Sequence, residues 1–204
     1  MFWIALAAAT ATQLSAPHPK HFWFESSDTP VQDMPQQGFA IVRLRLTISP
    51  VGVLRKCEIE QSSGVARLDS YTCDLTRLRA RFLSARLADG TPSYGVFRVP
   101  VVWALAPVDL NVDGDLVITV TALPEGIHSP ASVRLAIAVD RSGHISSCAD
   151  EAPAFAGAHP ADSQLVSIAC SQLTKNYAPP PATDEQGHAV SSVQTASVVF
   201  TTDK

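Results

Sequence analysis

Four cysteines are the residues of this 204-residue chain whose type and spacing most clearly point to chemistry. Cys57 and Cys73 bracket one stretch of sequence, and Cys148 and Cys170 bracket a second. Four cysteines can form two disulfides in three ways, so their number alone does not select a pairing. A Cys–His hydrolase needs one reactive thiol beside a base, whereas two matched pairs indicate structural cross-links.

The other reactive residues form no catalytic or metal-binding pattern. The segment DLNVDGDL, from Asp109 to Leu116, matches the first half of a calcium-binding EF-hand loop, but its twelfth position is Val120 instead of a bidentate glutamate. Only His18 and His21 lie close together, and no cysteine stands at zinc-site spacing from them. We therefore expect no cofactor, no metal and no enzymatic activity, and interpret DLNVDGDL as a turn.

Composition favours a folded protein without a nucleic-acid partner. Hydrophobic residues make up 46% of the chain and charged residues 17%, which is enough to build a core. A formal net charge of -4 argues against binding to a phosphate backbone.

The N-terminal apolar run is too short to span a bilayer, which needs about 20 apolar residues. Small-residue cleavage sites that end at Ala11 or Ala16 favour a signal peptide over residues 1–16. An uncleaved inner-membrane anchor facing the periplasm and a buried segment are the alternatives. Export to the periplasm would place the cysteines where disulfides form.

The chain repeats itself. VRLRLTISPVGVLRKC (42–57) aligns without a gap with VRLAIAVDRSGHISSC (133–148), and HFWFESSDTP (21–30) occupies a place similar to that of LVITVTALPE (116–125). We expect two units, 21–106 and 116–204, joined by a linker at 107–115. If each unit folds by itself, Cys57 pairs with Cys73 and Cys148 with Cys170.

Hydrophobic spacing predicts an α+β fold for each unit. Apolar and polar residues alternate from Val42 to Ile48, which is typical of a half-buried strand. A turn at 49–52 leads to a second strand at 53–61, and a third strand follows at 96–105. Five apolar residues at helical spacing predict a helix between the second and third strands: Leu68, Tyr71, Leu75, Leu78 and Phe82. Each unit is therefore expected to be a three-stranded antiparallel sheet of order β-β-α-β, with one helix packed on a face.

The order and spacing of several short motifs in the first unit resemble the C-terminal domain of the TonB family. They are the turn glycine, the Ser-Ser-Gly segment, the Leu-Asp pair, the RARF segment, the Ser-Ala pair and the Asp-Gly pair before the third strand: Gly52, Ser62, Ser63, Gly64, Leu68, Asp69, Arg79 to Phe82, Ser84, Ala85, Asp89 and Gly90. The second unit resembles the family more loosely, because it has no Ser-Ser-Gly segment.

The resemblance implies a periplasmic module that binds an extended segment of an outer-membrane receptor. Binding of this kind adds the peptide as a strand to an open sheet edge. By analogy the edge is the third strand, whose candidate residues are Tyr94, Val96, Arg98, Val99, Val101 and Trp103, with a counterpart at 191–200. Pro100 removes a ladder donor, which is tolerated on an edge strand.

An alternative is a structural protein of envelope assembly. Its sheet edges would pair with each other or with a second copy, which would leave no site for a peptide. The chain has no convincing membrane anchor and no long proline-rich spacer, so we favour binding over energy transduction by the chain itself.

Overall fold

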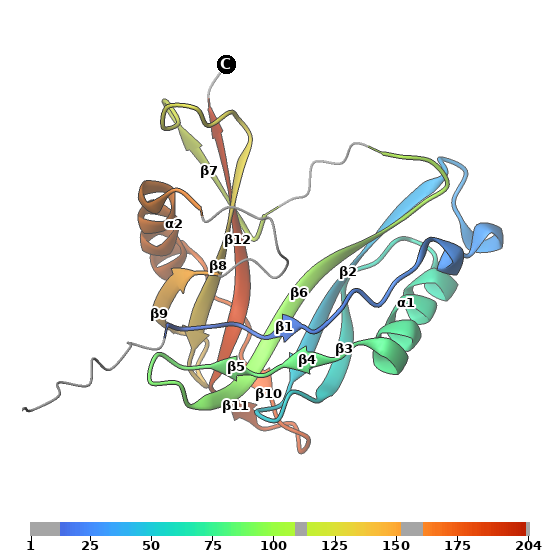
Figure 1. Ribbon diagram of the computed structural model, residues 1–204, viewed down its shortest axis with the longest axis horizontal. Helices are drawn as coiled ribbons and strands as arrows, with labels where there is room; N and C mark the ends of the chain where they lie inside the picture. Colours follow the sequence, from blue (N-terminus) through green and yellow to red (C-terminus); the bar gives the residue numbers. More distant parts are fainter. Residues whose placement is uncertain (1–12, 109–113, 152–160, 203–204) are drawn as a thin grey trace, which may run out of the picture.

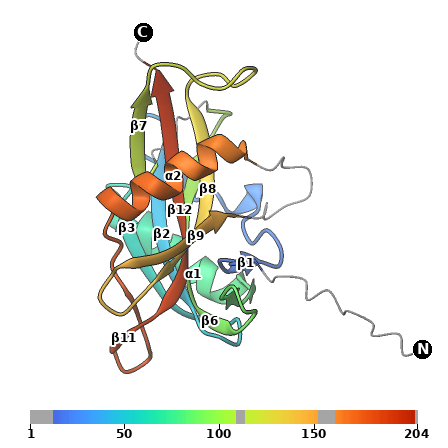
Figure 2. The ribbon, with the colours of Figure 1, turned by 90° about the vertical axis from the view of Figure 1, so that its left-hand side faces the viewer.

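The computed structural model describes residues 13–108, 114–151 and 161–202. Within these ranges the chain is an α+β protein, with two α-helices packed on a large sheet (Figures 1 and 2). The first half contains β2 (Phe39–Ile48), β3 (Leu54–Gln61), α1 (Ala66–Arg79) and β6 (Pro92–Ala104). The second half contains β8 (Ala131–Val139), β9 (Ile145–Asp150), α2 (Ser163–Asn176) and β12 (Ser192–Thr202). Both halves thus follow the β-β-α-β order that the repeat predicts.

Shorter elements connect these parts. They are β1 (His18–Pro19), β4 (Phe82–Leu83), β5 (Ala85–Arg86), β7 (Leu116–Val120), β10 (Ala182–Thr183), β11 (Ala189–Val190) and the 3-10 helices η1 (Ser26–Asp28) and η2 (Val31–Asp33). The β2–β3 turn requires a glycine at position 52, where φ is +79°. A Cβ atom there would lie 2.6 Å from the carbonyl oxygen of Phe82.

The sheets of the two halves are joined into one. The strand order is β3-β2-β6-β12-β8-β9, so the third strands β6 and β12 are neighbours at its centre (Figure 1). They pair in parallel at Tyr94–Ser192, Gly95–Val193 and Val96–Gln194. The prediction of two separate three-stranded sheets is therefore corrected. Each third strand covers part of the backbone edge that the other would otherwise expose.

The helices cover opposite faces of this sheet. Gly95 of β6 lies beside Val193 of β12, so odd-numbered residues of the two strands share a face. The core under α1 uses odd-numbered β6 residues such as Val101 and Trp103. The core under α2 uses even-numbered β12 residues such as Phe200. Figure 2 accordingly shows α2 in front of the sheet and α1 behind it. The halves keep separate cores although their sheets are continuous.

A third cluster fills the seam between the halves. It contains Leu14 and Ala16 from the N-terminal segment, Ala85 of β5, Ala136 and Ala138 of β8, and Val193 of β12. The segment is held by β1, which pairs with β4, and by a bridge between Ser15 and Arg86. The expected signal peptide at 1–16 lies mostly outside the described residues, but its last residues pack into this seam.

The helix of the first half differs from the expected one. Helix α1 ends at Arg79, so Phe82 belongs to β4 instead, and Leu78 is 67% exposed. The buried face includes Thr72 and Thr76, which apolar periodicity does not identify. These hydroxyls are buried because each accepts a hydrogen bond from a tryptophan, as described below.

Candidate functional site

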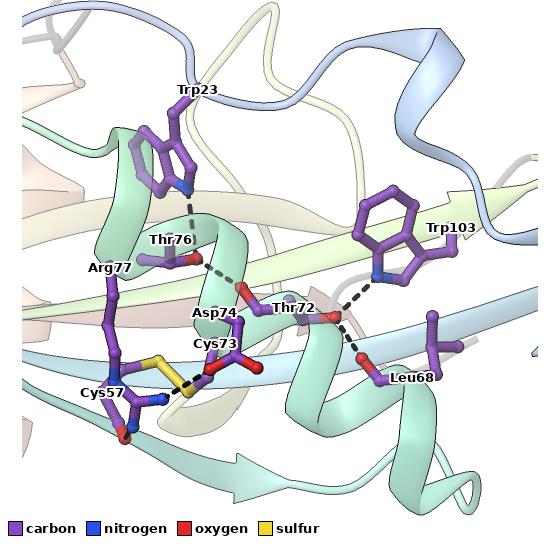
Figure 3. The surroundings of a disulfide bond; sticks show 9 residues. All are labelled: Trp23, Cys57, Leu68, Thr72, Cys73, Asp74, Thr76, Arg77 and Trp103. Carbon is purple, nitrogen blue, oxygen red and sulfur yellow. Dashed lines mark hydrogen bonds and ion pairs between the residues drawn. A yellow bond between two sulfur atoms is a disulfide. The ribbon is translucent and has the colours of Figure 1, made fainter.

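Two tryptophans hydrogen-bond to two threonines of α1 and hold strand β6 in place (Figure 3). We call these four residues the frame: Trp23, Trp103, Thr72 and Thr76. Trp103, near the end of β6, donates its indole N–H to the Thr72 hydroxyl at 2.9 Å. Trp23 donates to Thr76 at 3.2 Å, and this bond fastens the segment before β2 to the same helix. The two hydroxyls donate in turn to helix carbonyls at 2.7 Å. Every polar atom of this buried frame has a partner, which favours a single rigid position for the end of β6.

The disulfides fasten each helix to the second strand of its half. Cys57 of β3 joins Cys73 of α1, and Cys148 of β9 joins Cys170 of α2. These are the pairings that the repeat predicts. Around the first bond, Arg77 of α1 also donates to the carbonyl oxygen of Cys57 at 3.2 Å (Figure 3). Disulfides are typical of proteins that mature in an oxidising compartment.

The Ser-Ser-Gly corner is a structural joint between β3 and α1. The carboxylate of Asp69 accepts hydrogen bonds from the hydroxyls of Ser62 and Ser63 and from the Ser63 backbone N–H. Burial alone would raise the pKa of Asp69, but these bonds outweigh it and lower the pKa. Gly64 follows with a φ of +85°. Leu68 is buried in the core below, and Gly90 lies in the turn before β6. These motif residues therefore form the corner between β3 and α1 and the turn before β6, and both help to position β6.

The candidate binding edge is only partly open. Tyr94 and Val96 lie where β6 pairs with β12, so this half of the expected edge is closed. The other half runs past β12, because the two strands diverge after Val96 (Figure 1). Within the described residues, β6 has β2 as its only strand partner from Phe97 to Ala104. We call the stretch from Val101 to Leu105 the open edge of β6.

Arg98 fills the point where the strands diverge. Its backbone N–H donates to the Thr195 hydroxyl at 2.9 Å, and its Nη1 donates to the Gln194 side chain and the Thr195 carbonyl at 3.1 Å each. Its Nε donates to Glu60 of β3 at 3.0 Å. Arg98, an expected edge residue, is therefore 5% exposed and ties three strands together.

At alternate residues of the open edge, the backbone N–H and C=O groups point away from β2. The Arg98 N–H points toward β12, whereas the Leu105 N–H donates to Gly38 beside β2. By strand alternation, the N–H and C=O groups of Val102 and Ala104 point outward, as does the Pro100 carbonyl. Pro100 has no N–H to leave unpaired, so its position suits an edge.

An apolar groove lies beside β6 from Phe97 to Val102 and so reaches the start of the open edge. Its cavity of about 430 Å³ is lined by side chains of β6 and of the segment before β2: Pro19, Phe22, Trp23, Phe24, Phe97, Val99, Pro100, Val101, Val102 and Arg134. The walls of the groove expose apolar side chains to solvent: Phe22 is 72% exposed and Val102 is 39% exposed. Val99 and Val101, two further expected edge residues, belong to this lining, whereas Trp103 is buried in the frame below.

The corresponding edge of β12 is covered by the chain's own strand β7. Val42 pairs with Val101 in the first half as Val133 pairs with Val198 in the second. Strand β7 pairs in parallel with β12 from Val198 to Thr202, which corresponds to the open edge of β6. The sequence alignment placed 21–30 beside 116–125. The structure puts a strand in the second of these segments and the 3-10 helix η1 in the first.

Other expected features lie away from this groove or outside the described residues. Most of the EF-hand-like segment, residues 109–113, is outside them. In the described ranges no group of three or more His, Cys, Asp or Glu side chains is placed to hold a metal ion. None of the helices in these ranges has the length and apolar character needed to cross a membrane.

None of the family models, curated proteins or solved structures compared with the chain matches it.

Proposed function

We propose that the protein is a periplasmic, TonB-like binding protein that captures an extended peptide by adding it as a strand to the open edge of β6. The observation that carries this proposal is the difference between the two halves. Strand β7 covers one edge of β12. The corresponding stretch of β6 pairs with β2 on one side and, among the described residues, has no strand on its other side. A peptide of about five residues has the length of β7 and would complete the same pattern.

The groove supplies the two components that strand addition needs. Outward N–H and C=O groups of Val102 and Ala104 can extend the ladder, and each hydrogen bond contributes about 0.5–1.5 kcal/mol net. The exposed rings and aliphatic side chains beside them, including Phe22 and Val102, would bury apolar surface on binding. Because β7 runs parallel to β12, we expect the peptide to run parallel to β6 and to alternate apolar and polar residues.

The rigid frame makes this edge suitable for binding. Trp103 anchors the end of β6 to α1, and the Cys57–Cys73 bond anchors α1 to β3. A preformed edge loses little conformational freedom when a strand is added, so more of the interaction energy appears as affinity. An envelope partner such as a receptor segment linked to TonB-dependent transport fits this arrangement, with two disulfide-stabilised halves exported to the periplasm. An inner-membrane-anchored form facing the periplasm would present the same edge.

Self-association is the alternative function. An envelope-assembly protein would use the outer strands of its sheet to pair with a second copy. Outer strand β3 carries Arg55, Lys56, Glu58 and Glu60, and charges of this kind on an edge oppose strand pairing between copies. Peptide capture at the groove is therefore favoured.

The test uses the chain's own strand as a probe. A synthetic peptide DLVITV, the sequence from Asp115 to Val120, is titrated into the protein by calorimetry. We expect saturable binding that Val102→Pro weakens at least tenfold, because proline removes the outward N–H. The matched variant Val102→Ile keeps this N–H and should bind as the wild type does. No binding, or equal binding by Val102→Pro, contradicts peptide capture. Absence of peptide binding together with a wild-type dimer that Val102→Pro leaves intact in sedimentation experiments supports self-association through the outer strands instead.

A further inference from the structure

The pairing between β6 and β12 stops although neither strand ends there. In the described residues the two strands pair at three positions, and the last pair is Val96 with Gln194. Both strands then continue, β6 to Ala104 and β12 to Thr202. The residues that follow the last pair must therefore cause the two strands to diverge.

The first bond that would continue the pairing is replaced by two bonds to side chains. In a parallel ladder of this register, the N–H of Arg98 would donate to the carbonyl oxygen of Thr195. Instead, this N–H donates to the Thr195 hydroxyl at 2.9 Å, and the Thr195 carbonyl oxygen accepts from Nη1 of Arg98 at 3.1 Å. Each backbone group is thus satisfied by a side chain of the opposite residue, and the ladder does not continue.

The next bond of such a ladder is replaced as well. The N–H of Ser197 would donate to the Arg98 carbonyl oxygen, but it donates to the carboxylate of Asp115 at 2.7 Å. The Ser197 carbonyl oxygen accepts from the Asp115 N–H at 2.8 Å. Strand β7 begins directly after Asp115 and pairs with β12 from Val198 onward. At Asp115, therefore, the neighbour of β12 changes from β6 to β7.

Strand β6 favours the divergence through Pro100. Outward N–H groups of β6 belong to alternate residues, and after Arg98 the next such position is Pro100, which has no N–H. The first outward N–H beyond Arg98 is that of Val102. A ladder that extended along β6 would lack one bond at Pro100, so β12 has less to gain from β6 than from β7.

The guanidinium of Arg98 is held in position from two strands. Its Nε donates to Glu60 of β3 at 3.0 Å, and its Nη1 also donates to the side-chain oxygen of Gln194 at 3.1 Å. The side-chain nitrogen of Gln194 donates in turn to the Pro180 carbonyl oxygen at 3.1 Å. Arg98, Gln194 and Thr195 are all buried. Because a buried polar group that loses its partner cannot turn to water, these bonds hold Arg98 where it meets Thr195.

We infer that Arg98, Thr195 and Asp115 are positioning residues that end the β6–β12 ladder and keep β12 from closing the open edge of β6. Their side chains satisfy the backbone groups with which β12 would otherwise extend its pairing toward Val102. The open edge is thus maintained by specific bonds within the chain. Its importance for peptide capture rests on the proposed function, whereas the way in which the ladder ends does not.

The experiment measures amide hydrogen exchange by NMR in the wild type and in the double variant Thr195→Val with Asp115→Ala. Valine removes the hydroxyl that accepts from Arg98, and alanine releases the N–H of Ser197. We expect the Val102 amide to exchange at least tenfold more slowly and the protected amides of β7 at least tenfold faster, because β12 then pairs with β6 in place of β7. Simple loosening of the sheet would speed exchange in β7 without slowing it at Val102.

Two further variants serve as controls. The matched double variant Thr195→Ser with Asp115→Asn keeps a hydroxyl and a side-chain oxygen at the two positions and should exchange as the wild type does. Asp115→Ala alone preserves the buried bonds between Arg98 and Thr195, and it should change exchange in the same directions but less. It provides the test if the double variant does not fold. No slowing at Val102 in either alanine-containing variant would overturn the inference.

Peptide binding separates this inference from the proposed function. The double variant Thr195→Val with Asp115→Ala should bind the DLVITV peptide at least tenfold more weakly than the wild type, and the matched variant should bind it equally well. If the wild type does not bind the peptide but exchange changes as expected, the proposed function fails and the inference stands. If the wild type binds the peptide and exchange at Val102 is the same in all variants, the inference fails and the proposed function stands.

Discussion

Trp103 donates its indole N–H to the hydroxyl of Thr72 at 2.9 Å, and this bond connects the end of β6 to the middle of α1. Both residues are buried, with Trp103 3% and Thr72 0% exposed. The bond fixes where the open edge of β6 lies relative to the helix, so it affects the stability of the fold and the position of the edge that we propose binds a peptide.

Replacing Thr72 by valine should destabilise the protein. Valine has nearly the same shape but accepts no hydrogen bond, so the buried N–H of Trp103 loses its partner at a cost of about 1–3 kcal/mol. Urea unfolding measures this loss. Thr174→Val is the matched control, because Thr174 is an exposed helical threonine bonded only to the Cys170 carbonyl. Equal effects of the two changes would show that the tryptophan bond contributes nothing.

Removal of either disulfide should lower the free energy of unfolding by about 3 kcal/mol. The bonds close loops with sequence separations of 16 and 22 residues, for which the chain-entropy model gives this magnitude. Double alanine variants of each pair, compared in urea, measure the two contributions. Peptide mapping without reduction checks the pairing, and a link between Cys57 and Cys148 would contradict the fold described here.

Stability should depend on Glu151 between pH 4.5 and pH 7.5. Burial, the largest cause, raises the pKa of Glu151 from 4.5 to about 7 in the folded protein. The protonated form is thus favoured by folding. Its contribution is complete below the unfolded value and is lost as the pH rises through about 7. The stability of the wild type relative to Glu151→Gln should therefore fall by about 3 kcal/mol across this range.

The comparison with Glu151→Gln is needed because a neighbouring group acts in the opposite sense. His18 Nε2 lies 3.0 Å from Glu151 Oε1, and burial lowers the pKa of His18. Folding therefore disfavours the charged imidazole, and this effect removes stability as the pH falls below about 6.5. Unfolding curves at several pH values give the difference. A difference between the wild type and Glu151→Gln that does not vary with pH would contradict the prediction.

The segment from Leu14 to Ala16 should belong to the mature fold. Leu14 is 5% exposed in the seam between the halves, so Leu14→Ala should cost about 2–3 kcal/mol in urea unfolding. The exposed neighbour Gln13→Ala should have little effect. If a leader is removed, the cut that ends at Ala11 keeps this packing, whereas the cut at Ala16 removes it. Mass spectrometry of the protein from the envelope distinguishes the two.

Local patterns predicted much of the fold. The alternation from Val42 to Ile48 lies within β2, and the turn at Gly52 leads into β3 as expected. Apolar spacing predicts helix α1. The same spacing wrongly places Leu78 on the buried face and does not identify Thr72 as buried. A threonine looks polar in a sequence, and only the tryptophan that approaches from a distant segment makes it a core residue.

The candidate edge shows the same limit. The sequence predicts a third strand at 96–105, most of which lies in β6, but whether the edge of this strand is open depends on its neighbours. Tyr94 and Val96 are covered by β12, about 100 residues later in the chain, whereas Val102 is not. Arg98 was expected on an edge and instead lies buried among three strands.

By itself, the sequence determined the α+β class, the repeated β-β-α-β order and the pairing of cysteines within each half. Periodicity and internal repeats are local properties, and each half could bury its own core under one helix. Only the tertiary structure decided that the third strands pair with each other, that β7 covers β12 alone, and that Arg98 is buried where β6 and β12 diverge. These features depend on contacts between segments that lie far apart in the sequence, and the spacing of residues along the chain does not specify such contacts.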